Sequence, residues 1–579
     1  MFFKSYFDNW TFFQIFDFSN LTDKRMTDNY PWLQNYPKGV NFEINPDKYG
    51  SLVDLLEECF EKYDDLTAFE NFGATISYRK LDKLSLRFAS FLQNEAGLKP
   101  GDRVALQMPN LLQYPVALFG ALRAGCIVVN TNPLYTAREM EYQFKDAGVK
   151  AVVILANFAN NLEKVLPQLS IDTVIVTQIG DLMGFPKMPI VNFAVKHIKK
   201  MVPRYNIPNA ISFNDAIERG RKYAFSKPQI EGKDIAFLQY TGGTTGVSKG
   251  AMLTHRNMAA NMEQISEWMK PLLVEREEMV VTALPMYHIF ALTVNCLAFM
   301  KIGARNLLIT NPRDMKSFLK ELKNKRFTVF IGVNTLFNGL MNQPEFKNLD
   351  FSALKISVGG GMAVQKSVAE RWQEITGVTL AEGYGLTETS PVLTCNPIDG
   401  NEKIGTIGLP LPSTVIKLMD DHGNEVAEGE EGEVCVKGPQ VMPGYWRNSK
   451  ETEHVFRDGW FLTGDIGKVD KDGYFKIVDR KKDMINVSGF NVYPNEIENV
   501  IAAHPKVLEV GAVGATDEKG REMVKVFIVK KDPSLTREEL FAYCRENLTA
   551  YKVPKLVEFR DELPKSNIGK ILRRALVEA

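Results

Sequence analysis

The chain has 579 residues, of which 45% are hydrophobic and 24% are charged, a composition typical of globular proteins rather than disordered or fibrous ones. The 70 acidic and 70 basic residues cancel, so the basic excess of a nucleic-acid-binding protein is missing and we expect no nucleic-acid partner. The length predicts more than one domain and a large buried core.

Aromatic side chains crowd the first 18 residues of the chain. Asp8 and Asp17 interrupt this apolar run and no cleavage site of small residues follows it, so the segment does not fit a signal peptide. We interpret residues 1–25 as an upstream extension that results from the choice of start site. An aromatic tail that touches a membrane is the alternative.

Helical and strand-like runs alternate from about residue 52 to 176, and again from 235 to about 382. Residues 103–108 and 151–155 are predicted strands, and residues 114–122 are a predicted buried helix. This alternation indicates an α/β fold, in which helices flank β-sheets in a large N-terminal domain.

Residues 191–204, with the sequence VNFAVKHIKKMVPR, predict a basic amphipathic helix. Apolar residues recur at helical spacing, and Lys196, Lys199 and Lys200 fall mostly on the other side. Such a helix can lie in a bilayer interface, so we predict peripheral association with the inner membrane. An ordinary solvated surface helix is the alternative.

Residues 279–300 carry no formal charge and are long enough to span a membrane. Pro285, His288 and Asn295 lie within this stretch, together with other polar groups that hydrocarbon would not satisfy. A buried strand, a loop and a buried helix fit the pattern better than a transmembrane helix.

The pattern changes after residue 393, where short strand-like pieces are separated by turn signals. This spacing indicates a small β-rich subdomain, which we predict to be a β-barrel. A last α+β unit contains a predicted strand at 524–529 and a predicted helix at 537–547. The charged stretch at 479–483 lies between the two regions and is a plausible hinge.

Six cysteines are scattered along the chain without CxxC spacing, and the six histidines form no HExxH pattern. A disulfide scaffold or a zinc site is therefore not expected. We expect a reducing, cytoplasmic compartment.

A glycine-rich segment at 240–250, YTGGTTGVSKG, directly follows a predicted strand at 235–240. Its glycines let the backbone approach a ligand closely, and its hydroxyl groups and Lys249 suit phosphate oxygens. It is not a Walker A loop, because Gly250 rather than Ser or Thr follows Lys249.

This segment resembles the phosphate-binding signature of the adenylate-forming enzymes. Four further signatures of that superfamily follow in the same order: GYGLTET at 383–389, FLTGD at 461–465, DRKKDMI at 479–485 and PKSNIGKI at 564–571. Within the superfamily, segments such as LPMYHIFALTVNCL at 284–297 and VSGFNVYPNEIE resemble the long-chain fatty acyl-CoA ligases of bacteria. The resemblance covers about residues 28–579.

The resemblance implies three parts: an extension at 1–27, an N-terminal adenylating domain at 28–479 and a small mobile C-terminal domain at 480–579. It implies that the protein uses ATP and Mg²⁺ to convert a long-chain fatty acid to acyl-AMP and then forms a thioester with coenzyme A. A fatty acyl-AMP ligase that loads a carrier protein and an inactive fatty-acid-binding relative are the alternatives. A homodimer is also expected.

The resemblance further implies which residues hold the nucleotide. The phosphate-binding loop contributes Thr241, Gly242, Gly243, Thr244, Thr245, Gly246 and Lys249. Gly383, Tyr384 and Gly385 would flank the adenine, with Tyr384 offering a stacking face. Asp465 would accept from both ribose hydroxyls, and Arg480 would approach the ribose and the phosphate.

A fatty acid carboxylate is already ionised at neutral pH, so the site must overcome repulsion between two anions rather than remove a proton. By resemblance, Lys570 bridges the carboxylate and the α-phosphate. Glu388 is the Mg²⁺ ligand and Thr387 meets the α-phosphate; Mg²⁺ often takes only one or two protein carboxylates. His288 would close over the carboxylate site, although a satisfied core histidine is the alternative.

Lys482 matches the hinge position of the family, about which the C-terminal domain rotates after adenylation. The rotation would bring Gly489 to the site, where a glycine lets the pantetheine arm of coenzyme A pass close to the backbone.

The sequence gives a weaker indication of the acyl pocket. Its plausible lining residues, which could equally be ordinary core, are Leu292, Val294, Leu297, Val333, Leu336, Phe337 and Leu340. Leu292 stands where some relatives carry a tryptophan gate, which leaves the gating of the tunnel open.

Overall fold

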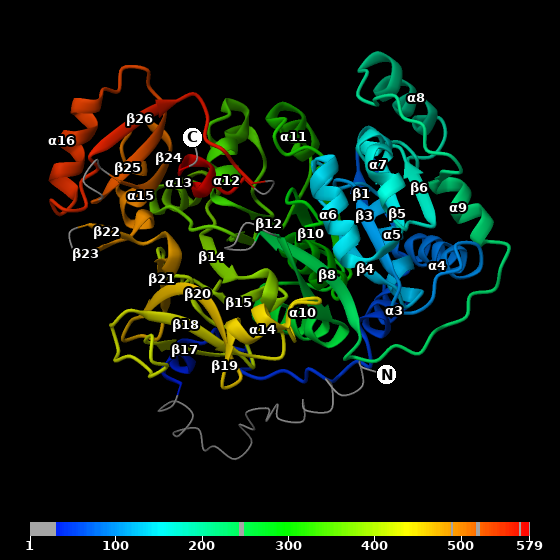
Figure 1. Cartoon of the computed structure of the whole chain (residues 1–579), viewed down its shortest axis with the longest axis horizontal. Coiled ribbons are helices and arrows are strands. Elements are labelled where there is room, and N and C mark those ends of the chain that lie inside the picture. Colours follow the sequence, from blue (N-terminus) through cyan, green and yellow to red (C-terminus); the bar gives the residue numbers. More distant parts are fainter. Residues whose placement is uncertain (1–29, 243–247, 488–489, 517–520, 567–568, 578–579) are drawn as a thin grey trace.

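The structure is a computed structural model that describes residues 30–242, 248–487, 490–516, 521–566 and 569–577 (Figure 1). The predicted extension at 1–27 lies outside the described residues. So do five predicted site residues: Gly243, Thr244, Thr245, Gly246 and Gly489.

The first large sheet has seven strands in the order β7-β6-β5-β3-β4-β8-β9, and all neighbours are parallel except β8 and β9. The strands are β3 (Arg103–Gln107), β4 (Ile127–Asn130), β5 (Val149–Leu155), β6 (Thr173–Thr177), β7 (Ile211–Ser212), β8 (Ile235–Gly242) and β9 (Ser248–Thr254). The predicted strands at 103–108, 151–155 and 235–240 are confirmed.

Helices cover this sheet and connect its strands in the right order for parallel pairing. They are α4 (Tyr78–Asn94), α5 (Gln113–Arg123), α6 (Ala137–Ala147), α7 (Ala159–Val165) and α9 (Phe213–Gly220), with short turns η3 (Ala156–Phe158) and η4 (Leu166–Gln168). Every residue of α5 is buried, because this helix packs on α4 and on strands β3 and β4. The predicted buried helix at 114–122 is confirmed.

The second large sheet has nine strands in the order β16-β15-β14-β13-β12-β10-β11-β1-β2. Its centre, from β14 to β1, is parallel, and both of its ends are antiparallel. The strands are β1 (Thr67–Asn71), β2 (Ala74–Ser77), β10 (Met279–Thr282), β11 (Arg305–Leu308), β12 (Val329–Gly332), β13 (Ile356–Gly359), β14 (Leu380–Gly385), β15 (Val392–Cys395) and β16 (Leu409–Pro410).

Buried helices join the two sheets into one hydrophobic core. The helices and turns of this part are η2 (Pro31–Asn35), α3 (Leu52–Lys62), α10 (His255–Met269), the π-helix η6 (Ala291–Ala298), α11 (Met315–Leu322), α12 (Asn334–Met341), η7 (Pro344–Asn348), α13 (Lys366–Thr376) and η8 (Thr387–Thr389). Residues 279–300 form β10, a loop and η6, as predicted. Among the described residues, no helix is both long and apolar enough to span a membrane.

The β-rich part is an antiparallel sheet of five strands: β17 (Val415–Met419), β18 (Gly432–Lys437), β19 (Phe456–Arg457), β20 (Trp460–Val469) and β21 (Phe475–Arg480). Helix α14 (Ser449–Val455) precedes β19. The predicted β-rich part is confirmed, and its strands form an open sheet rather than the predicted barrel. Among the described residues, β17 pairs with β18 and bridges Glu425 through Met419, but it does not pair with β19 or β21 at the other edge.

The last part has its own hydrophobic core, formed only by residues from Ile485 onward. Strand β24 (Val507–Thr516) pairs antiparallel with β25 (Glu522–Lys530), which pairs parallel with β26 (Leu556–Arg560). The other elements are η9 (Lys481–Asp483), the hairpin β22 (Ile485–Val487) and β23 (Phe490–Val492), and helices α15 (Pro494–Ala502), α16 (Arg537–Asn547) and α17 (Arg573–Val577). The predicted strand at 524–529 and helix at 537–547 are confirmed. The domain boundary at 479–480 stays a prediction.

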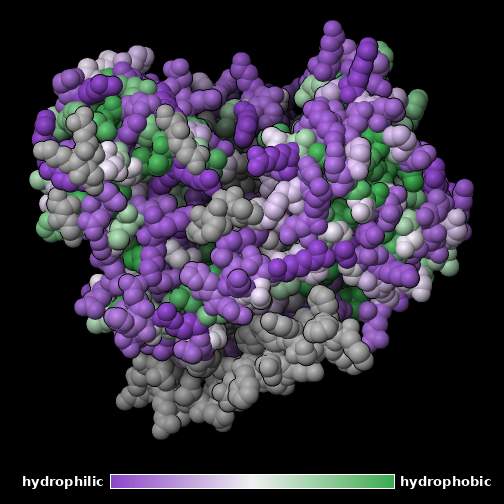
Figure 2. Space-filling model, viewed as in Figure 1, coloured by the Kyte–Doolittle hydropathy of each residue, from purple (hydrophilic) through white to green (hydrophobic). Residues whose placement is uncertain are grey.

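The predicted amphipathic helix at 191–204 has different ends in the structure. Helix α8 (Lys187–Phe193) begins earlier and continues as one π-turn, η5 (Ala194–Ile198). It stops there because Lys200 has a left-handed backbone (φ 52°) and Pro203 cannot continue a helix. This segment forms a corner of the molecule where hydrophilic side chains project beside hydrophobic ones (Figures 1 and 2).

The carboxyl ends of strands from both large sheets point toward one region. Thr241 and Gly242 end β8, His288 follows β10, and Tyr384 and Gly385 end β14. Ligands of open α/β sheets bind at this edge. The fold therefore places the predicted site where two such edges meet.

Candidate functional site

Asp465 and Arg480 face each other because β20 and β21 pair with these two residues in register. Arg480 Nε lies 2.7 Å from Asp465 Oδ1, and the Tyr384 hydroxyl donates to Asp465 Oδ2 at 2.6 Å. The Asp465 side chain is 4% exposed, whereas that of Arg480 is 36% exposed. The sequence-predicted adenine and ribose residues are thus brought together, with the arginine still accessible to a ligand.

Burial raises the pKa of Asp465, and the positive charges of Arg480 and Lys570 and the hydrogen bond from Tyr384 oppose this rise. Burial is the largest single influence and lowers the pKa of Arg480, but the nearby acidic groups, of which Asp465 contributes most, together outweigh it and the net shift is upward. The pair is therefore held as an ion pair in a poorly solvated wall.

Glu388 lies in the single turn η8, just beyond the end of β14, and is buried. Its Oε1 accepts a hydrogen bond from the Tyr445 hydroxyl at 2.8 Å, and its backbone oxygen accepts from Met442 N at 2.8 Å. Burial raises the pKa of Glu388. A cation would relieve this cost, so the residue fits a metal ligand. Thr387 precedes it in the same turn and is half-buried.

Lys249 lies on β9 and forms an ion pair with Glu451 of α14. Its side chain is 9% exposed, and its ammonium group lies 5.6 Å from the centre of the Tyr445 ring. The hairpin of β8 and β9 also contacts η8, which carries Glu388. The structure therefore joins the described ends of the glycine-rich segment to the Glu388 turn, but the charge of Lys249 is already paired.

Lys570 reaches this region from the C-terminal part of the chain. The Thr335 hydroxyl, at the start of α12, donates to the backbone oxygen of Gly569 at 3.1 Å. A Cβ atom on Gly569, whose φ is +86°, would lie 2.6 Å from that hydroxyl, so only glycine fits this contact. The pKa of Lys570 is lowered to about 8, first by desolvation and then by the charge of Arg480, although its side chain keeps an exposed surface. The contact and the shared charges place Lys570 beside the Asp465–Arg480 pair.

His288 follows β10 and is half-buried. Its Nδ1 accepts from Phe290 N at 3.3 Å. Desolvation, with the charge of Lys570 adding to it, lowers its pKa to about 4, so the imidazole is neutral near pH 7. The functional and core interpretations of His288 both fit this placement.

At two positions, close packing explains why the residue is glycine. A Cβ on Gly385 would lie 1.9 Å from the backbone oxygen of Pro391, so this glycine permits β14 and β15 to pair closely. A Cβ on Gly360 would lie 2.9 Å from Phe290 and 3.1 Å from the oxygen of Gly383. The turn at 359–361 therefore packs tightly against β14.

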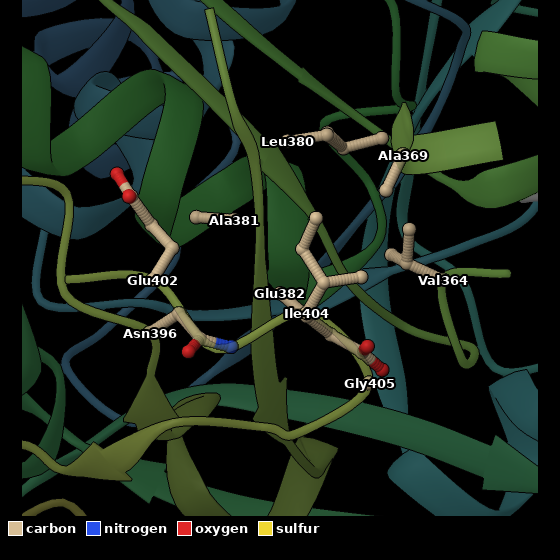
Figure 3. A pocket seen from close by; sticks show the side chains of 9 residues that line it. All are labelled: Val364, Ala369, Leu380, Ala381, Glu382, Asn396, Glu402, Ile404 and Gly405. Carbon is tan, nitrogen blue, oxygen red and sulfur yellow. The ribbon is translucent and has the colours of Figure 1, made fainter. Parts of the chain in front are cut away.

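A cavity of about 10 Å³ lies at Glu382 of β14 (Figure 3). It has room for about one water molecule and none for a nucleotide. Burial raises the pKa of Glu382 to about 8. Helix α13, β14 and residues 396–405 line it. Neither Asp465 nor Arg480 lines this cavity, and Tyr384, which bonds Asp465, lies two residues after Glu382 on the same strand.

The remaining predicted residues are the hinge lysine and the residues of the acyl pocket. Lys482 is exposed in η9, directly after Arg480 and Lys481. The predicted acyl-pocket residues are all buried in the main core: Leu292, Val294, Leu297, Val333, Leu336, Phe337 and Leu340. The sequence did not single out Tyr445, Glu451, Thr335 or Arg573. Tyr445 lies in the segment KGPQVMPGYW that carries the resemblance, but nothing in the sequence pairs it with Glu388.

Comparison with known proteins identifies the family of the chain. A family model described as AMP-binding enzyme matches residues 56–446, and a second, described as AMP-binding enzyme C-terminal domain, matches residues 496–570 and so ends on Lys570. The chain is 59% identical, over 94% of its length, to a long-chain-fatty-acid–CoA ligase of Escherichia coli, of which it spans 97%. It is 39% identical, over 96% of its length, to a long-chain-fatty-acid–CoA ligase of Bacillus subtilis, of which it spans 98%.

Solved structures give the same assignment. The anthranilate CoA ligase AuaEII, in complex with anthranoyl-AMP, superposes with a TM-score of 0.81 at 25% identity and covers 92% of this chain and 98% of its own. ATP-bound MatB from Rhodopseudomonas palustris has a TM-score of 0.78 at 30% identity, over 91% of this chain and 98% of its own. The chain therefore belongs to the AMP-binding enzyme family.

Proposed function

We propose that the protein activates long-chain fatty acids with ATP and transfers the acyl group to coenzyme A. The proposed product is acyl-CoA, and AMP and pyrophosphate are released. Relatives named long-chain-fatty-acid–CoA ligase are 39–59% identical over nearly the whole chain, which supports this substrate and reaction.

The observation that carries the proposal is the position of Lys570. The lysine stands on a separate C-terminal body, yet its loop contacts Thr335 and its charge acts on Asp465 and His288. A cation delivered to a wall that already holds a ribose-binding carboxylate and an arginine suits the joining of two anions.

In the proposed first step, a carboxylate oxygen of the fatty acid attacks the α-phosphorus of ATP. The bond from that phosphorus to the bridging oxygen breaks, and pyrophosphate leaves with the electron pair. Lys570 and Arg480 would stabilise the charge on the phosphate oxygens, and Asp465 would hold the ribose. Neutral His288 would lie over the carboxylate without adding charge.

In the proposed second step, the sulfur of coenzyme A attacks the acyl carbon, and AMP leaves with the oxygen that joined it to the acyl group. The thiol proton passes to solvent. The C-terminal domain would rotate about Lys482 and bring Gly489 near the site. Exposure of Lys482 in η9, with few side chains to displace, supports it as the hinge.

Mg²⁺ belongs to this proposal through Glu388, which is buried, has a raised pKa and would gain from a cation. When bound, the ion would neutralise phosphate charge. Thr387, in the same turn, would contact the α-phosphate, and the glycine-rich segment from Thr241 to Lys249 would hold the other phosphates.

The test is ATP–pyrophosphate exchange with palmitate, followed by release of free AMP when coenzyme A is added. We expect both activities. No exchange would leave only an inactive fatty-acid-binding relative. Exchange in which acyl-AMP accumulates despite coenzyme A would instead favour an acyl-AMP ligase that loads a carrier protein. A chain-length series tests the preference for long acyl chains, because each buried CH₂ adds about 0.8 kcal/mol.

We further propose that the corner formed by α8 and η5 docks on an anionic membrane surface. Five large apolar side chains are exposed there, at 51–90%: Phe185, Ile190, Phe193, Ile198 and Met201. Five basic residues lie among them: Lys187, Lys196, Lys199, Lys200 and Arg204. No acidic residue occurs from 182 to 214, so this segment is basic and complementary to anionic lipid; Asp314, which precedes α11, is an acidic neighbour within electrostatic range of Lys199.

Co-sedimentation with vesicles that contain phosphatidylglycerol tests this docking. Replacing Lys196, Lys199 and Lys200 with Gln should weaken binding about a hundredfold, because each lysine near such a surface contributes about 1 kcal/mol. The same change at the exposed lysines Lys347, Lys450 and Lys471 is the matched control and should leave binding intact. Equal binding by both variants would refute the surface. A cytoplasmic location and a homodimer stay predictions.

A further inference from the structure

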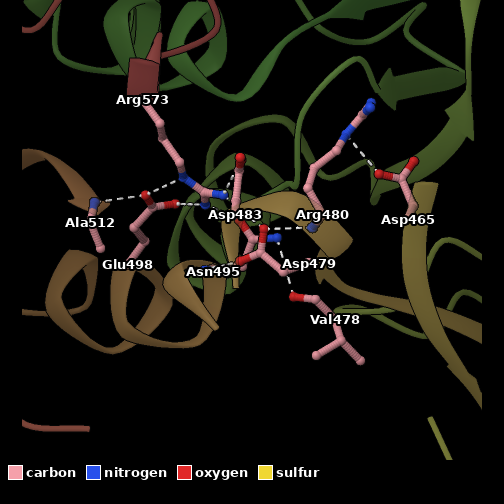
Figure 4. Close-up of polar contacts among 9 residues, drawn as sticks. All are labelled: Asp465, Val478, Asp479, Arg480, Asp483, Asn495, Glu498, Ala512 and Arg573. Carbon is pink, nitrogen blue, oxygen red and sulfur yellow. Dashed lines mark hydrogen bonds and ion pairs between the residues drawn. The ribbon is translucent and has the colours of Figure 1, made fainter. Parts of the chain in front are cut away.

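Arg573, three residues after Lys570, ties the C-terminal segment to the predicted hinge (Figure 4). Its guanidinium group donates to Asp479 Oδ1 at 2.7 Å, Asp483 Oδ2 at 3.3 Å, Asn495 Oδ1 at 2.5 Å, and Glu498 Oε1 and Oε2 at 3.1 and 2.8 Å. One planar fork thus serves four side chains, which a lysine could not do.

The partners of Arg573 lie on both sides of Lys482. Asp479 is in β21, before the hinge, whereas Glu498 is in α15, after it. Asp479 is fully buried, and its Oδ2 also accepts from the backbone N–H of Asn495 at 2.7 Å. Two carboxylates on opposite sides of the hinge therefore share one arginine.

We propose that Arg573 is a positioning residue for Lys570, and that its ion pair with Asp479 is a latch that holds the C-terminal domain in the adenylating arrangement. The inference rests on the proposed function, because it assigns the latched state to the first half-reaction.

The two halves of the cluster differ in what a hinge rotation does to them. Glu498 also accepts from Ala512 N at 2.8 Å, so Glu498, Ala512 and Arg573 belong to the C-terminal body and move together. Asp479 stays behind with β21. Rotation about Lys482 must therefore break the contact with Asp479 and leave the contact with Glu498 intact.

This arrangement suits a reversible latch. When Asp479 is released, Arg573 keeps the bidentate partner Glu498 and is not left as an unpaired buried charge. Asp479 keeps the backbone N–H of Arg480, which lies on its own side of the hinge at 2.7 Å. Both charged side chains keep a hydrogen-bond partner after the latch opens, which limits the free energy needed to open it.

Contacts beside the Lys570 loop are weaker than this latch. The Thr335 hydroxyl donates to Gly569 at 3.1 Å, and Asn338 Nδ2 donates to Leu508 O at 3.4 Å. Both are neutral, whereas the latch is charge-assisted and buried. Holding Lys570 in place therefore depends on the distant latch as well as on the loop.

The test separates the two half-reactions. Asp479→Asn keeps the shape of the side chain and removes its charge. We expect ATP–pyrophosphate exchange to fall tenfold to a hundredfold, and thioester formation from synthetic acyl-AMP to stay within twofold of the unaltered protein. Arg573→Lys keeps the positive charge but loses the planar fork, so its ATP–pyrophosphate exchange should lie between that of the unaltered protein and that of Asp479→Asn. Arg560→Lys is the matched control, because Arg560 pairs with Glu558 of its own strand β26.

A distance measurement reports the domain position without relying on activity. All six native cysteines are buried, so spin labels on Lys347→Cys and Lys555→Cys, which are exposed on the two bodies, can be read selectively. With ATP present we expect one short distance in the unaltered background and a broadened, longer distribution with Asp479→Asn.

Two outcomes would overturn the latch: equal loss of both half-reactions in Asp479→Asn, or a distance distribution that the substitution leaves unchanged. Absence of exchange in the unaltered protein would instead contradict the proposed function, and the distance measurement would still test the latch.

Discussion

The two walls of the site are built in different ways. On the N-terminal wall, the Asp465–Arg480 pair is set by the register of adjacent strands, and Tyr384 and Tyr445 hold the carboxylates by short hydrogen bonds. On the C-terminal wall, Lys570 is an exposed residue on a loop, and this loop is held by a hydrogen bond from Thr335 to the backbone oxygen of Gly569. The N-terminal wall is preorganised by the sheets, whereas the position of Lys570 on the C-terminal wall depends on how the C-terminal part is held.

This difference suits a two-step enzyme. The groups proposed to hold the nucleotide would be needed in both steps, and they lie in or beside the sheets. Lys570, the cation proposed for adenylation, lies on a loop that the proposed domain rotation would move away. Loss of a group from the first wall should therefore harm both steps, and loss from the second should harm one.

The largest effect is expected for Lys570→Ala. Removing a unit charge that acts at about 4 Å costs on the order of 4 kcal/mol at an intermediate dielectric, which corresponds to about a thousandfold in exchange. Thioester formation from synthetic acyl-AMP should be largely retained. Rapid-quench assays of each half-reaction measure the split.

Gly489→Leu is the mirror experiment for the same comparison. We expect adenylation to be retained and thioester formation to be lost, because a branched side chain would obstruct the pantetheine arm. If both variants lost both half-reactions equally, the contrast between the two walls would be wrong.

The next effect is expected for Glu388→Gln on the preorganised wall. Exchange should fall about a hundredfold, as for removal of one strong electrostatic group, and half-saturation by Mg²⁺ should move to higher concentration. Glu402→Gln, in the cavity at Glu382, is the control carboxylate and should change neither quantity. An unaltered Mg²⁺ response in Glu388→Gln would exclude this residue as the ligand.

Tyr384→Phe probes the hydrogen bond that holds Asp465. A hydrogen bond to a charged group contributes about 1.5–3 kcal/mol, so we expect the KM for ATP in the first half-reaction and the KM for acyl-AMP in the second each to rise about tenfold. Tyr474→Phe, whose hydroxyl donates to Asn401 O away from the site, is the matched control. A change confined to one half-reaction would contradict the assignment of Tyr384 to a wall used in both.

The sequence predicted the rigid wall better than the moving one. The ordered signatures that carry the family resemblance singled out Asp465, Arg480 and Glu388 as candidates, and the structure pairs Asp465 with Arg480. It could not show that Tyr445 would reach Glu388 across 57 residues. Nor could it show that Glu451 would neutralise Lys249, because long-range pairing leaves no local pattern.

The errors have similar causes. The barrel prediction counted strands but could not show that β17 would lie at an edge without pairing to β19 or β21. The amphipathic pattern extended the helix to Arg204 because side-chain periodicity continued past the backbone break at Lys200. Arg573 escaped notice because an arginine at a C-terminal end is ordinarily solvated, and only the fold brings three carboxylates to it.

The smallest expected effect is a change in the pH profile of exchange, and it concerns Lys570 on the C-terminal wall. The pKa of Lys570 is lowered to about 8 by desolvation and by Arg480. Because the unfolded chain has the higher pKa, the folded protein gains stability as pH rises above 8, while the cation proposed for adenylation is lost over the same range. Between pH 7 and 8.5 the protonated fraction falls about fourfold, so kcat/KM for ATP in exchange should fall by that factor, since this quantity reports the free enzyme. Lys570→Arg keeps its charge and should flatten the profile, whereas a fall of the same size in that variant would assign the titration to another group.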